Sequence, residues 1–225
     1  MPLVPAPVKS RKRARKIVTS FHKLAKEVDD EAARSGCHGE GTSGKRRLRE
    51  LQQQLEEERQ AYQSASLLSV GFHNTSKWIT QQLTKMDLRP GKGNPPLKVL
   101  EVGAINTRLL DVSWLEVRAI DLKSSHPRIE ERDFFALPPA TEYDVVASSM
   151  VLNCVPTPEG RGKMLMGYHD HLRPGGHLFL MIPLLCLTNS CYTTKESFRK
   201  TLELAGFQVR ESRDSPRVAF FCATA

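Results

Sequence analysis

The chain has 225 residues, of which 40% are apolar and 26% are charged. This composition supports a sizeable buried core and excludes wholesale disorder. The formal net charge is +8, and it is unevenly distributed: residues 1–49 hold 13 Lys/Arg and 5 Asp/Glu, whereas residues 50–225 hold 20 of each. The excess positive charge therefore belongs to an N-terminal arm, and the neutral remainder is not expected to be a broadly basic nucleic-acid binder.

The sequence carries no run of about 18 uncharged apolar residues, so we expect no transmembrane helix and no membrane partner. The basic N-terminus is not followed by an apolar segment, so we expect no secretory signal. The five cysteines are widely spread, and no CxxC pair occurs. We therefore expect free thiols in a reducing compartment and no metal site.

Residues 1–47 are predicted to be a basic, flexible tail. Arg11–Lys16 and Lys45–Arg47 form two basic clusters, residues 17–34 are compatible with one amphipathic helix, and residues 35–44 are rich in Gly and Ser, as a linker would be. The clusters are typical of a nuclear or nucleolar address combined with contacts to RNA phosphates. A solvated charged tail without such a role is the alternative.

Residues 48–96 are predicted to be a helical N-terminal extension. Leu48, Leu51 and Leu55 follow helical spacing within a strong helix-forming segment, and a second helix is expected over residues 75–86. The Gly- and Pro-rich residues 89–96 end any helix and lead into the next element.

From residue 97 to the C-terminus, short apolar strands alternate with helices. Strands are expected at residues 97–102, 115–121, 143–148 and 177–182, with a final pair at 207–211 and 218–223; helices are expected at about 160–172 and 194–205. Thr193 and Glu196 are predicted to form a capping box on the last helix, which Gly206 ends. This alternation predicts an α/β fold with a parallel sheet, and the final hairpin adds an antiparallel strand.

Acidic residues and a glycine stand where the first strands end. Glu101 precedes Gly103 by two residues, and Asp121 ends the second strand twenty residues after Glu101. A glycine there lets a ligand approach the backbone, and a carboxylate can accept hydrogen bonds from two ribose hydroxyls. Asp133-Phe134 follows, a pair suited to the amine and the face of an adenine ring. The alternatives are a turn glycine, a helix cap and a core phenylalanine.

The order of these residues narrows the class of protein. G-x-G-x-x-G and G-x-x-x-x-G-K-[ST] are absent, which disfavours a dinucleotide site and excludes a P-loop. The order E-x-G, Asp, Asp-Phe resembles the class I S-adenosylmethionine methyltransferases. The resemblance implies a Rossmann-like seven-stranded sheet that ends in a hairpin, and S-adenosyl-L-methionine as the cofactor. Ile105 and Thr107 replace two glycines of that class, and the connection from Gly103 to Val117 hardly leaves room for a full crossover helix.

Longer motifs in the middle of the chain are more specific. They are Asp121–Ile129 leading to Asp133-Phe134, Ser149–Pro156 with Arg161-Gly162 and Met164-Leu165, and Ile182–Tyr192, with Tyr62–Ser66 and Thr75–Trp78 upstream. Together they resemble the fungal 25S rRNA adenine-N(1) methyltransferases of the nucleolus, from about Tyr62 to the C-terminus. The resemblance implies rRNA or a pre-ribosome as partner, a role in ribosome biogenesis, and cofactor positions at Gly103 and Asp121. We expect a monomer.

The substrate side agrees with a ring nitrogen as methyl acceptor. Enzymes that methylate an exocyclic amine often carry Asn/Asp-Pro-Pro-Tyr/Phe after the fourth strand, and residues 149–152 lack it. N1 of adenine has an in-plane lone pair and needs alignment rather than deprotonation. The resemblance favours Asn153 and Asn189 as readers of the base edge and Tyr192 as a stacking residue. Capping, local backbone bonding and simple packing are their respective alternatives, and no catalytic residue is identified.

Two other functions stay open at this point. A methyltransferase-fold sensor that binds S-adenosylmethionine and signals through a protein partner would tolerate the altered glycine turn. A small-molecule methyltransferase would not need the basic arm. Cofactor binding without methylation of rRNA would favour the sensor.

Overall fold

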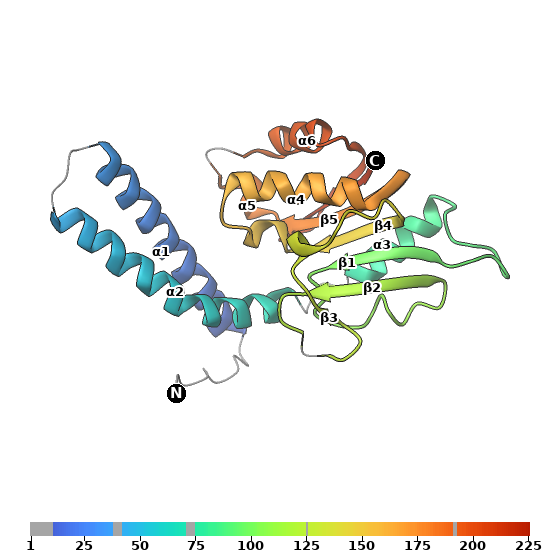
Figure 1. Cartoon of the computed structure of the whole chain (residues 1–225), viewed down its shortest axis with the longest axis horizontal. Helices are drawn as coiled ribbons and strands as arrows, with labels where there is room; N and C mark the ends of the chain where they lie inside the picture. Colours follow the sequence, from blue (N-terminus) through green and yellow to red (C-terminus); the bar gives the residue numbers. More distant parts are fainter. Residues whose placement is uncertain (1–10, 38–41, 71–74, 125, 191–192) are drawn as a thin grey trace. The chain divides into compact units, whose positions relative to one another are not determined.

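The computed structural model describes residues 11–37, 42–70, 75–124, 126–190 and 193–225. The chain divides into two compact units, Met1–His73 and Asn74–Ala225. Each unit is described by itself (Figure 1). The domain boundaries expected at residues 47 and 96 stay predictions, whereas the division between the two units falls at residue 73.

The first unit is a pair of helices, α1 (Arg11–Cys37) and α2 (Thr42–Val70), which contact each other along their length (Figure 1). The helix expected over residues 17–34 lies within α1, and the leucines predicted at helical spacing lie within α2. The half-buried positions of α1 recur every three or four residues at Ile17, Phe21, Leu24, Val28 and Glu31. This spacing places them on one stripe of the helix, as packing against a second helix requires. The linker predicted over residues 35–44 is shorter in the structure: residues 35–37 belong to α1 and residues 42–44 to α2, and residues 38–41 lie outside the described residues.

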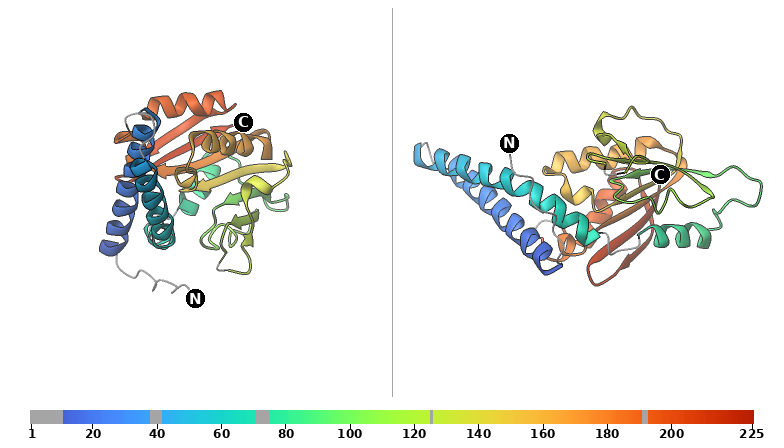
Figure 2. Two further views of the ribbon diagram at one scale, coloured as in Figure 1. Left: turned by 60° about the vertical axis from the view of Figure 1, so that its left-hand side comes forward. Right: turned by 90° about the horizontal axis from the view of Figure 1, so that it is seen from below.

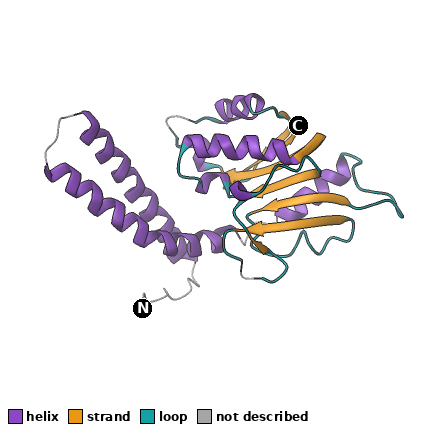
Figure 3. Ribbon diagram, viewed as in Figure 1, coloured by secondary structure: helices purple, strands orange, loops and turns teal. Residues whose placement is uncertain are grey.

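The second unit is built on a seven-stranded sheet with the order β3-β2-β1-β4-β5-β7-β6 (Figure 3). The strands are β1 (Leu97–Val102), β2 (Leu115–Asp121), β3 (Glu130–Glu131), β4 (Tyr143–Ser149), β5 (Leu172–Pro183), β6 (Gln208–Asp214) and β7 (Val218–Thr224). Strands β1 to β5 pair with one another in parallel, and β7 is antiparallel to both β5 and β6. The predicted seven-stranded sheet and its final hairpin are therefore confirmed.

Helices cover both faces of this sheet (Figure 2). On β1, Leu100 belongs to the core under α4 (Pro158–His171) and α6 (Lys195–Leu204), and Val99 belongs to the core under α3 (Thr75–Lys85). Alternate residues of a strand point to opposite faces, which is why neighbouring apolar residues serve different cores. Trp78 of α3 packs its ring against Phe179 and Phe220, with ring centroids 5.4 and 5.0 Å apart.

The segment between β1 and β2 contains no helix, as the short connection predicts. Thr107 Oγ1 donates a hydrogen bond to Asp111 Oδ2 at 3.1 Å, and Arg128 Nη1 pairs with Asp111 Oδ1 at 2.7 Å. A second nitrogen of Arg128 donates to the Leu110 carbonyl. These side-chain bonds hold a series of turns in the place that a crossover helix takes in larger α/β sheets.

The predicted capping box of the last helix is wrong by one residue. Thr194 caps α6: its hydroxyl accepts a hydrogen bond from Ser197 N at 3.1 Å, and Ser197 Oγ accepts one from Thr194 N at 2.8 Å. Thr193 instead donates its backbone N–H to Ser190 Oγ. Two adjacent threonines offer the same capping chemistry, and the preceding loop decides which of them has the extended backbone of a cap.

Candidate active site

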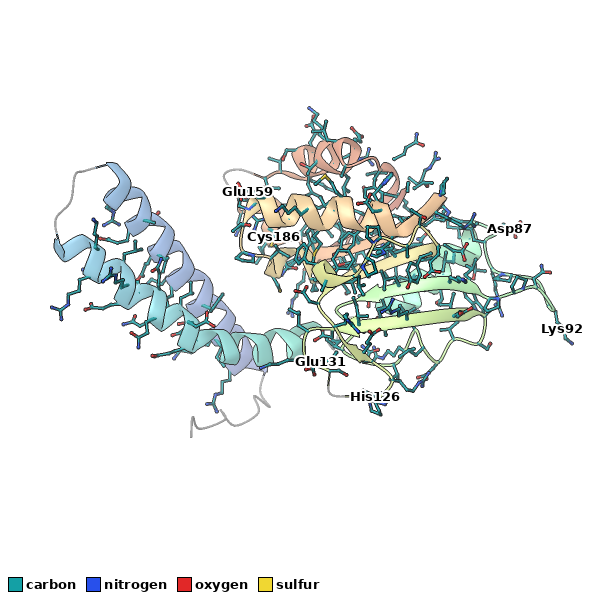
Figure 4. The ribbon with its side chains drawn as sticks, in the orientation of Figure 1. Asp87, Lys92, His126, Glu131, Glu159 and Cys186 are labelled. Carbon is teal, nitrogen blue, oxygen red and sulfur yellow. The ribbon has the colours of Figure 1, made fainter. Side chains whose placement is uncertain are left out.

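The carboxyl ends of β1, β2 and β4 lie side by side, because these strands are parallel and adjacent. Glu101 pairs in register with Ala119 on one side and Ala147 on the other, and Gly103 N donates to the Ile120 carbonyl at 2.9 Å. Figure 4 shows Glu131, at the end of β3, on this edge of the sheet, whereas Lys92 lies beyond the opposite edge. Ligands of α/β sheets bind at such carboxyl ends.

Gly103 adopts the left-handed backbone conformation, with φ +75°. A Cβ atom added to it would lie 2.2 Å from Val151 Cγ2 and 3.9 Å from Asp121 Oδ2. The chain after β4 is turned by Met150, which has φ 62°, and the side chain of Val151 then covers the glycine. The structure thus requires glycine here for two reasons, the backbone angle and the close approach of Val151. The role of Gly103 toward a ligand stays a prediction.

Glu101 is a half-buried acid at the end of β1, and its Oε2 atom is fully buried. Burial raises the pKa of its carboxyl group from 4.5 to about 8, because the charged form loses its hydration. Its Oε2 atom is buried and has no hydrogen-bond partner among the described residues. At neutral pH the group is mostly protonated. A cationic group placed beside it would draw the proton off and form a strong ion pair.

Asp121 ends β2 beside the glycine turn. Its Oδ1 atom accepts a hydrogen bond from Lys123 N at 2.8 Å, and its Oδ2 atom faces the Gly103 turn. Burial raises the pKa of Asp121, and the nearby charge of Glu131 adds to the shift, whereas the bond from Lys123 N opposes it. Glu101, Gly103 and Asp121 therefore meet at one edge, as the sequence predicts.

Asp133 and Phe134 are placed differently from each other. Asp133 Oδ1 accepts from Phe135 N at 2.9 Å and caps the short helix η1 (Phe134–Ala136). The Phe134 ring is buried against the rings of Tyr168 and His171, with centroids 5.1 and 5.5 Å away. The structure therefore places Phe134 in the core, and Phe135, 51% exposed, is the accessible ring of the pair. Their contact with an adenine stays a prediction.

Two polar side chains follow or end β4 with buried, unpartnered atoms. Asn153 lies in the short helix η2 (Leu152–Cys154); its Oδ1 atom is buried without a partner among the described residues, and its Nδ2 makes only a long contact of 3.5 Å to Cys154 Sγ. Ser149, the last residue of β4, has a buried Oγ atom that is unpartnered in the same sense. Buried polar atoms are rarely left unpaired, so these atoms point to a ligand. Ser149 is not among the site residues predicted from the sequence, although a serine that ends an apolar strand is a signal for such a site.

The two remaining predicted substrate residues are not brought into this cluster by any contact. Asn189 follows α5 (Leu185–Thr188), is exposed, donates its N–H to the Leu185 carbonyl, and accepts from Thr188 Oγ1 at 3.4 Å. These bonds agree with the alternative of local backbone bonding. Tyr192 lies outside the described residues. Both substrate roles stay predictions.

Within the described ranges, no three His, Cys, Asp or Glu side chains are grouped as a metal ion would need. No helix in the same ranges combines the length and the apolar character of a membrane span.

The strand order and the antiparallel β7 define the chain as an α/β protein of the class I methyltransferase fold. A solved S-adenosylmethionine-dependent methyltransferase from Clostridium acetobutylicum ATCC 824 has the same fold, with a TM-score of 0.53 and 11% identity over 68% of this chain and 93% of that chain. The family model for 25S rRNA (adenine(2142)-N(1))-methyltransferase, Bmt2, matches residues 49–225. The chain belongs to this family.

Two curated relatives carry the same family name. The 25S rRNA adenine-N(1) methyltransferase of Schizosaccharomyces pombe is 31% identical over 134 residues, which cover 56% of this chain and 49% of the relative. The 25S rRNA (adenine(2142)-N(1))-methyltransferase of Saccharomyces cerevisiae is 29% identical over 151 residues, covering 64% and 44% respectively. The chain thus spans about half the length of the curated relatives it matches.

Proposed function

We propose that this protein transfers a methyl group from S-adenosyl-L-methionine to N1 of an adenine in large-subunit rRNA. The observation that carries the proposal is the group of three buried polar atoms without partners among the described residues, Glu101 Oε2, Ser149 Oγ and Asn153 Oδ1, at the carboxyl ends of β1 and β4. The relatives named as 25S rRNA adenine-N(1) methyltransferases support the reaction and the substrate. None of the comparisons favours the sensor.

The acidic residues at the ends of β1 and β2, together with Asp133 and Phe135, have the chemistry that the cofactor needs. S-adenosyl-L-methionine supplies an electrophilic methyl group when it is bound. Glu101, whose Oε2 atom is buried without a partner among the described residues, is suited to the ammonium group of its methionine part, and Asp121 is suited to the ribose hydroxyls. Asp133 and the exposed Phe135 are suited to its adenine. These residues bind and orient, and none of them has to move a proton from the substrate.

The side chain of Asn153 has the chemistry to bind an adenine as the methyl acceptor. The attacking lone pair of N1 lies in the plane of the base, beside the exocyclic N6 amine, which is a hydrogen-bond donor. Asn153 Oδ1 is an acceptor without a described partner, so it can take a hydrogen bond from N6 and reject guanine, which carries an oxygen there. Methylation of N1 leaves a cation and requires no general base. Alignment of the two atoms therefore supplies much of the rate.

The basic arm and the family both favour a nucleolar location for this protein. The basic clusters before residue 50 supply phosphate affinity and are typical of nuclear and nucleolar proteins. The protein would act there as a monomer during ribosome biogenesis, on rRNA or on a pre-ribosome. Fluorescence of a tagged chain in intact cells tests the location, and light scattering tests the monomer.

Mass spectrometry of rRNA nucleosides tests the reaction. The chain is incubated with S-adenosyl-L-methionine and unmodified 25S rRNA, and the digest is kept near neutral pH because 1-methyladenosine rearranges to N6-methyladenosine in alkali. We expect 1-methyladenosine with the wild-type chain and at least tenfold less with Asn153→Ala. Methylation of the exocyclic amine by the wild-type chain would contradict the proposal, and so would cofactor binding without any methylated rRNA.

A further inference from the structure

A groove runs along the exposed side of α3, and none of the residues that line it belongs to the candidate active site. Two adjoining hollows of about 460 and 350 Å³ lie between α3 and the segment that connects β1 to β2. They share Thr80 and Val112, so they form one continuous depression. Its charged and aromatic lining consists of Lys77, Arg89, Arg108, Asp111 and Trp114.

The groove is positively charged. Lys77, Arg89 and Arg108 contribute three cations, and their side chains are exposed. The carboxylate of Asp111 is already matched by Arg128 at 2.7 Å and by Thr107 at 3.1 Å, and these bonds lower its pKa. Residues 74–225 hold 19 Lys/Arg and 16 Asp/Glu, a net of +3. Three cations gathered in one groove therefore stand out against an otherwise balanced unit.

The guanidinium group of Arg89 is oriented by the ring of Trp114. Its guanidinium carbon lies 5.5 Å from the centre of the Trp114 ring, which is the range of a cation–π contact. Such a contact orients the guanidinium and leaves its edge donors for a ligand. A guanidinium fixed in this way is suited to the paired oxygens of a phosphate.

One wall of the groove is the segment that runs from the end of β1 back to the start of β2. Arg108 lies five residues after Gly103, on the segment that leaves the candidate active site. Trp114 lies at the other end, where its carbonyl accepts a hydrogen bond from Leu97 N at the start of β1. From Lys77 to Thr84 the helix rises by about 10 Å at 1.5 Å per residue, enough for more than one phosphate of an extended strand.

We propose that this groove binds the phosphates of the RNA strand that leads to the methylated adenine. The inference rests on the proposed function, because it takes rRNA as the substrate. The second unit, whose charges are nearly balanced, would then have a phosphate-binding site of its own, separate from the basic arm. The site recognises backbone rather than sequence, since contacts to phosphates carry no direct information about the bases.

Salt-dependent binding of a single-stranded 25S rRNA fragment tests the groove, with the full-length chain and without cofactor. The test variant is Lys77→Gln with Arg89→Gln and Arg108→Gln. Each phosphate contact to a single strand contributes about 0.7 to the slope of log K against log salt, or about fivefold in affinity at 0.1 M relative to 1 M. We expect the variant to bind on the order of 100-fold more weakly at 0.1 M salt, and its slope to fall by about 2.

A matched control removes the same charge elsewhere: Lys163→Gln with Arg199→Gln and Lys200→Gln, on α4 and α6, which cover the opposite face. We expect its slope to stay within about 0.5 of the wild type. A second variant, Arg89→Lys with Arg108→Lys, keeps the charge and should keep the slope. Thermal melts establish that each variant is folded.

Equal weakening in the groove variant and the control would overturn the proposal, since long-range charge would then explain both. An unchanged salt slope in the folded groove variant would also overturn the proposal, because the groove would then make no contact with RNA phosphates. The measurement is independent of methyl transfer: if the wild-type chain binds through the groove but does not methylate rRNA, the proposed function fails and the groove stands.

Discussion

Glu101 shows how one residue links the apolar core to ligand chemistry. The residue is half-buried at the end of β1 and its Oε2 atom is fully buried, and this burial raises the pKa of its carboxyl group to about 8 because the charged form loses its hydration. A folded protein keeps such an acid at a cost to stability, and it does so most often at functional sites. The pH dependence of stability and of ligand binding both follow from this shift.

The first prediction concerns stability against pH. The folded chain binds the Glu101 proton more tightly than the unfolded chain, so the free energy of unfolding should fall as pH rises from 4.5 to about 8. Glu101→Gln removes this titration. Urea unfolding should therefore show the variant gaining roughly 3 kcal/mol relative to the wild type between pH 5 and pH 8. Glu116→Gln, at an exposed position of β2, is the control and should run parallel to the wild type. If the unfolding free energy of Glu101→Gln also followed that of the wild type across this pH range, the raised pKa of Glu101 would be contradicted.

The second prediction concerns proton release. If the cofactor ammonium binds beside Glu101, the carboxyl group must ionise, so binding near pH 7 should release up to one proton and strengthen as pH rises toward 8. Calorimetry of S-adenosyl-L-methionine binding in buffers of different ionisation enthalpy measures this number. Glu101→Gln should bind without the release. Identical proton release by the variant and the wild type would place the ammonium elsewhere.

The third prediction concerns Asp121, whose Oδ2 faces the glycine turn. Replacing it by Ala should weaken S-adenosyl-L-methionine binding by about 1.5–3 kcal/mol, the worth of charge-assisted hydrogen bonds. Titration calorimetry with the folded variant checks the value. Asp214→Ala, at the exposed end of β6, is the control and should bind normally. Unchanged affinity in the Asp121 variant would remove this residue from the cofactor site.

At the scale of elements, one buried hydrogen bond connects β4 to the helix that covers it. Ser148 and Tyr168 share a hydroxyl–hydroxyl bond of 2.7 Å, and both side chains are fully buried. Burial also raises the pKa of Tyr168, so it stays neutral. Ser148 and Ser149 are neighbours on one strand, yet the alternation of a strand turns Ser148 toward α4 and Ser149 away from it. The first serine is structural, and the second belongs to the candidate site.

The fourth prediction separates these two roles. Tyr168→Phe leaves Ser148 buried without its hydroxyl partner and should lower the free energy of unfolding by about 1–3 kcal/mol, with cofactor affinity unchanged. Adding Ser148→Ala should recover part of that stability, because both polar groups are then gone. Chemical denaturation and calorimetry measure the two effects. Cofactor affinity that falls together with stability in Tyr168→Phe would contradict a purely structural role.

At the scale of the whole molecule, the charge is divided between the two units. Residues 1–73 hold 14 Lys/Arg and 9 Asp/Glu, a net of +5, although the excess is concentrated before residue 50. The candidate site lies entirely within the second unit. Phosphate affinity and cofactor binding should therefore be separable.

The fifth prediction uses this division. Deleting residues 1–73 should spare S-adenosyl-L-methionine binding, because Glu101, Gly103 and Asp121 all belong to the second unit. It should weaken rRNA binding and reduce its salt slope by about 0.7 for each single-stranded phosphate that the arm no longer neutralises. Binding titrations at several salt concentrations measure both. An unchanged slope would show that the helical pair of α1 and α2 is only a solvated appendage.

Local sequence patterns are enough to predict the sheet and the position of its key carboxylates. Apolar runs separated by turn residues place β1, β2, β4 and the final hairpin to within three residues, since burial on both faces leaves little choice of pattern. β5 begins five residues before its predicted start, because residues 172–176 lack a continuous apolar run. Glu101, Gly103 and Asp121 could be predicted to meet, because parallel strands bring their carboxyl ends to one edge. The absence of a crossover helix between β1 and β2 could also be predicted, because the connecting segment is short.

Packing between distant segments, in contrast, determines which polar atoms remain unpaired. Whether Phe134 faces a ligand or the core depends on Tyr168 and His171, which are more than thirty residues away in the chain. The role of Ser149, the cover that Val151 places over Gly103 and the groove beside α3 depend in the same way on residues far apart in the chain. Local patterns fix where a residue lies along a strand, and packing fixes what its side chain meets.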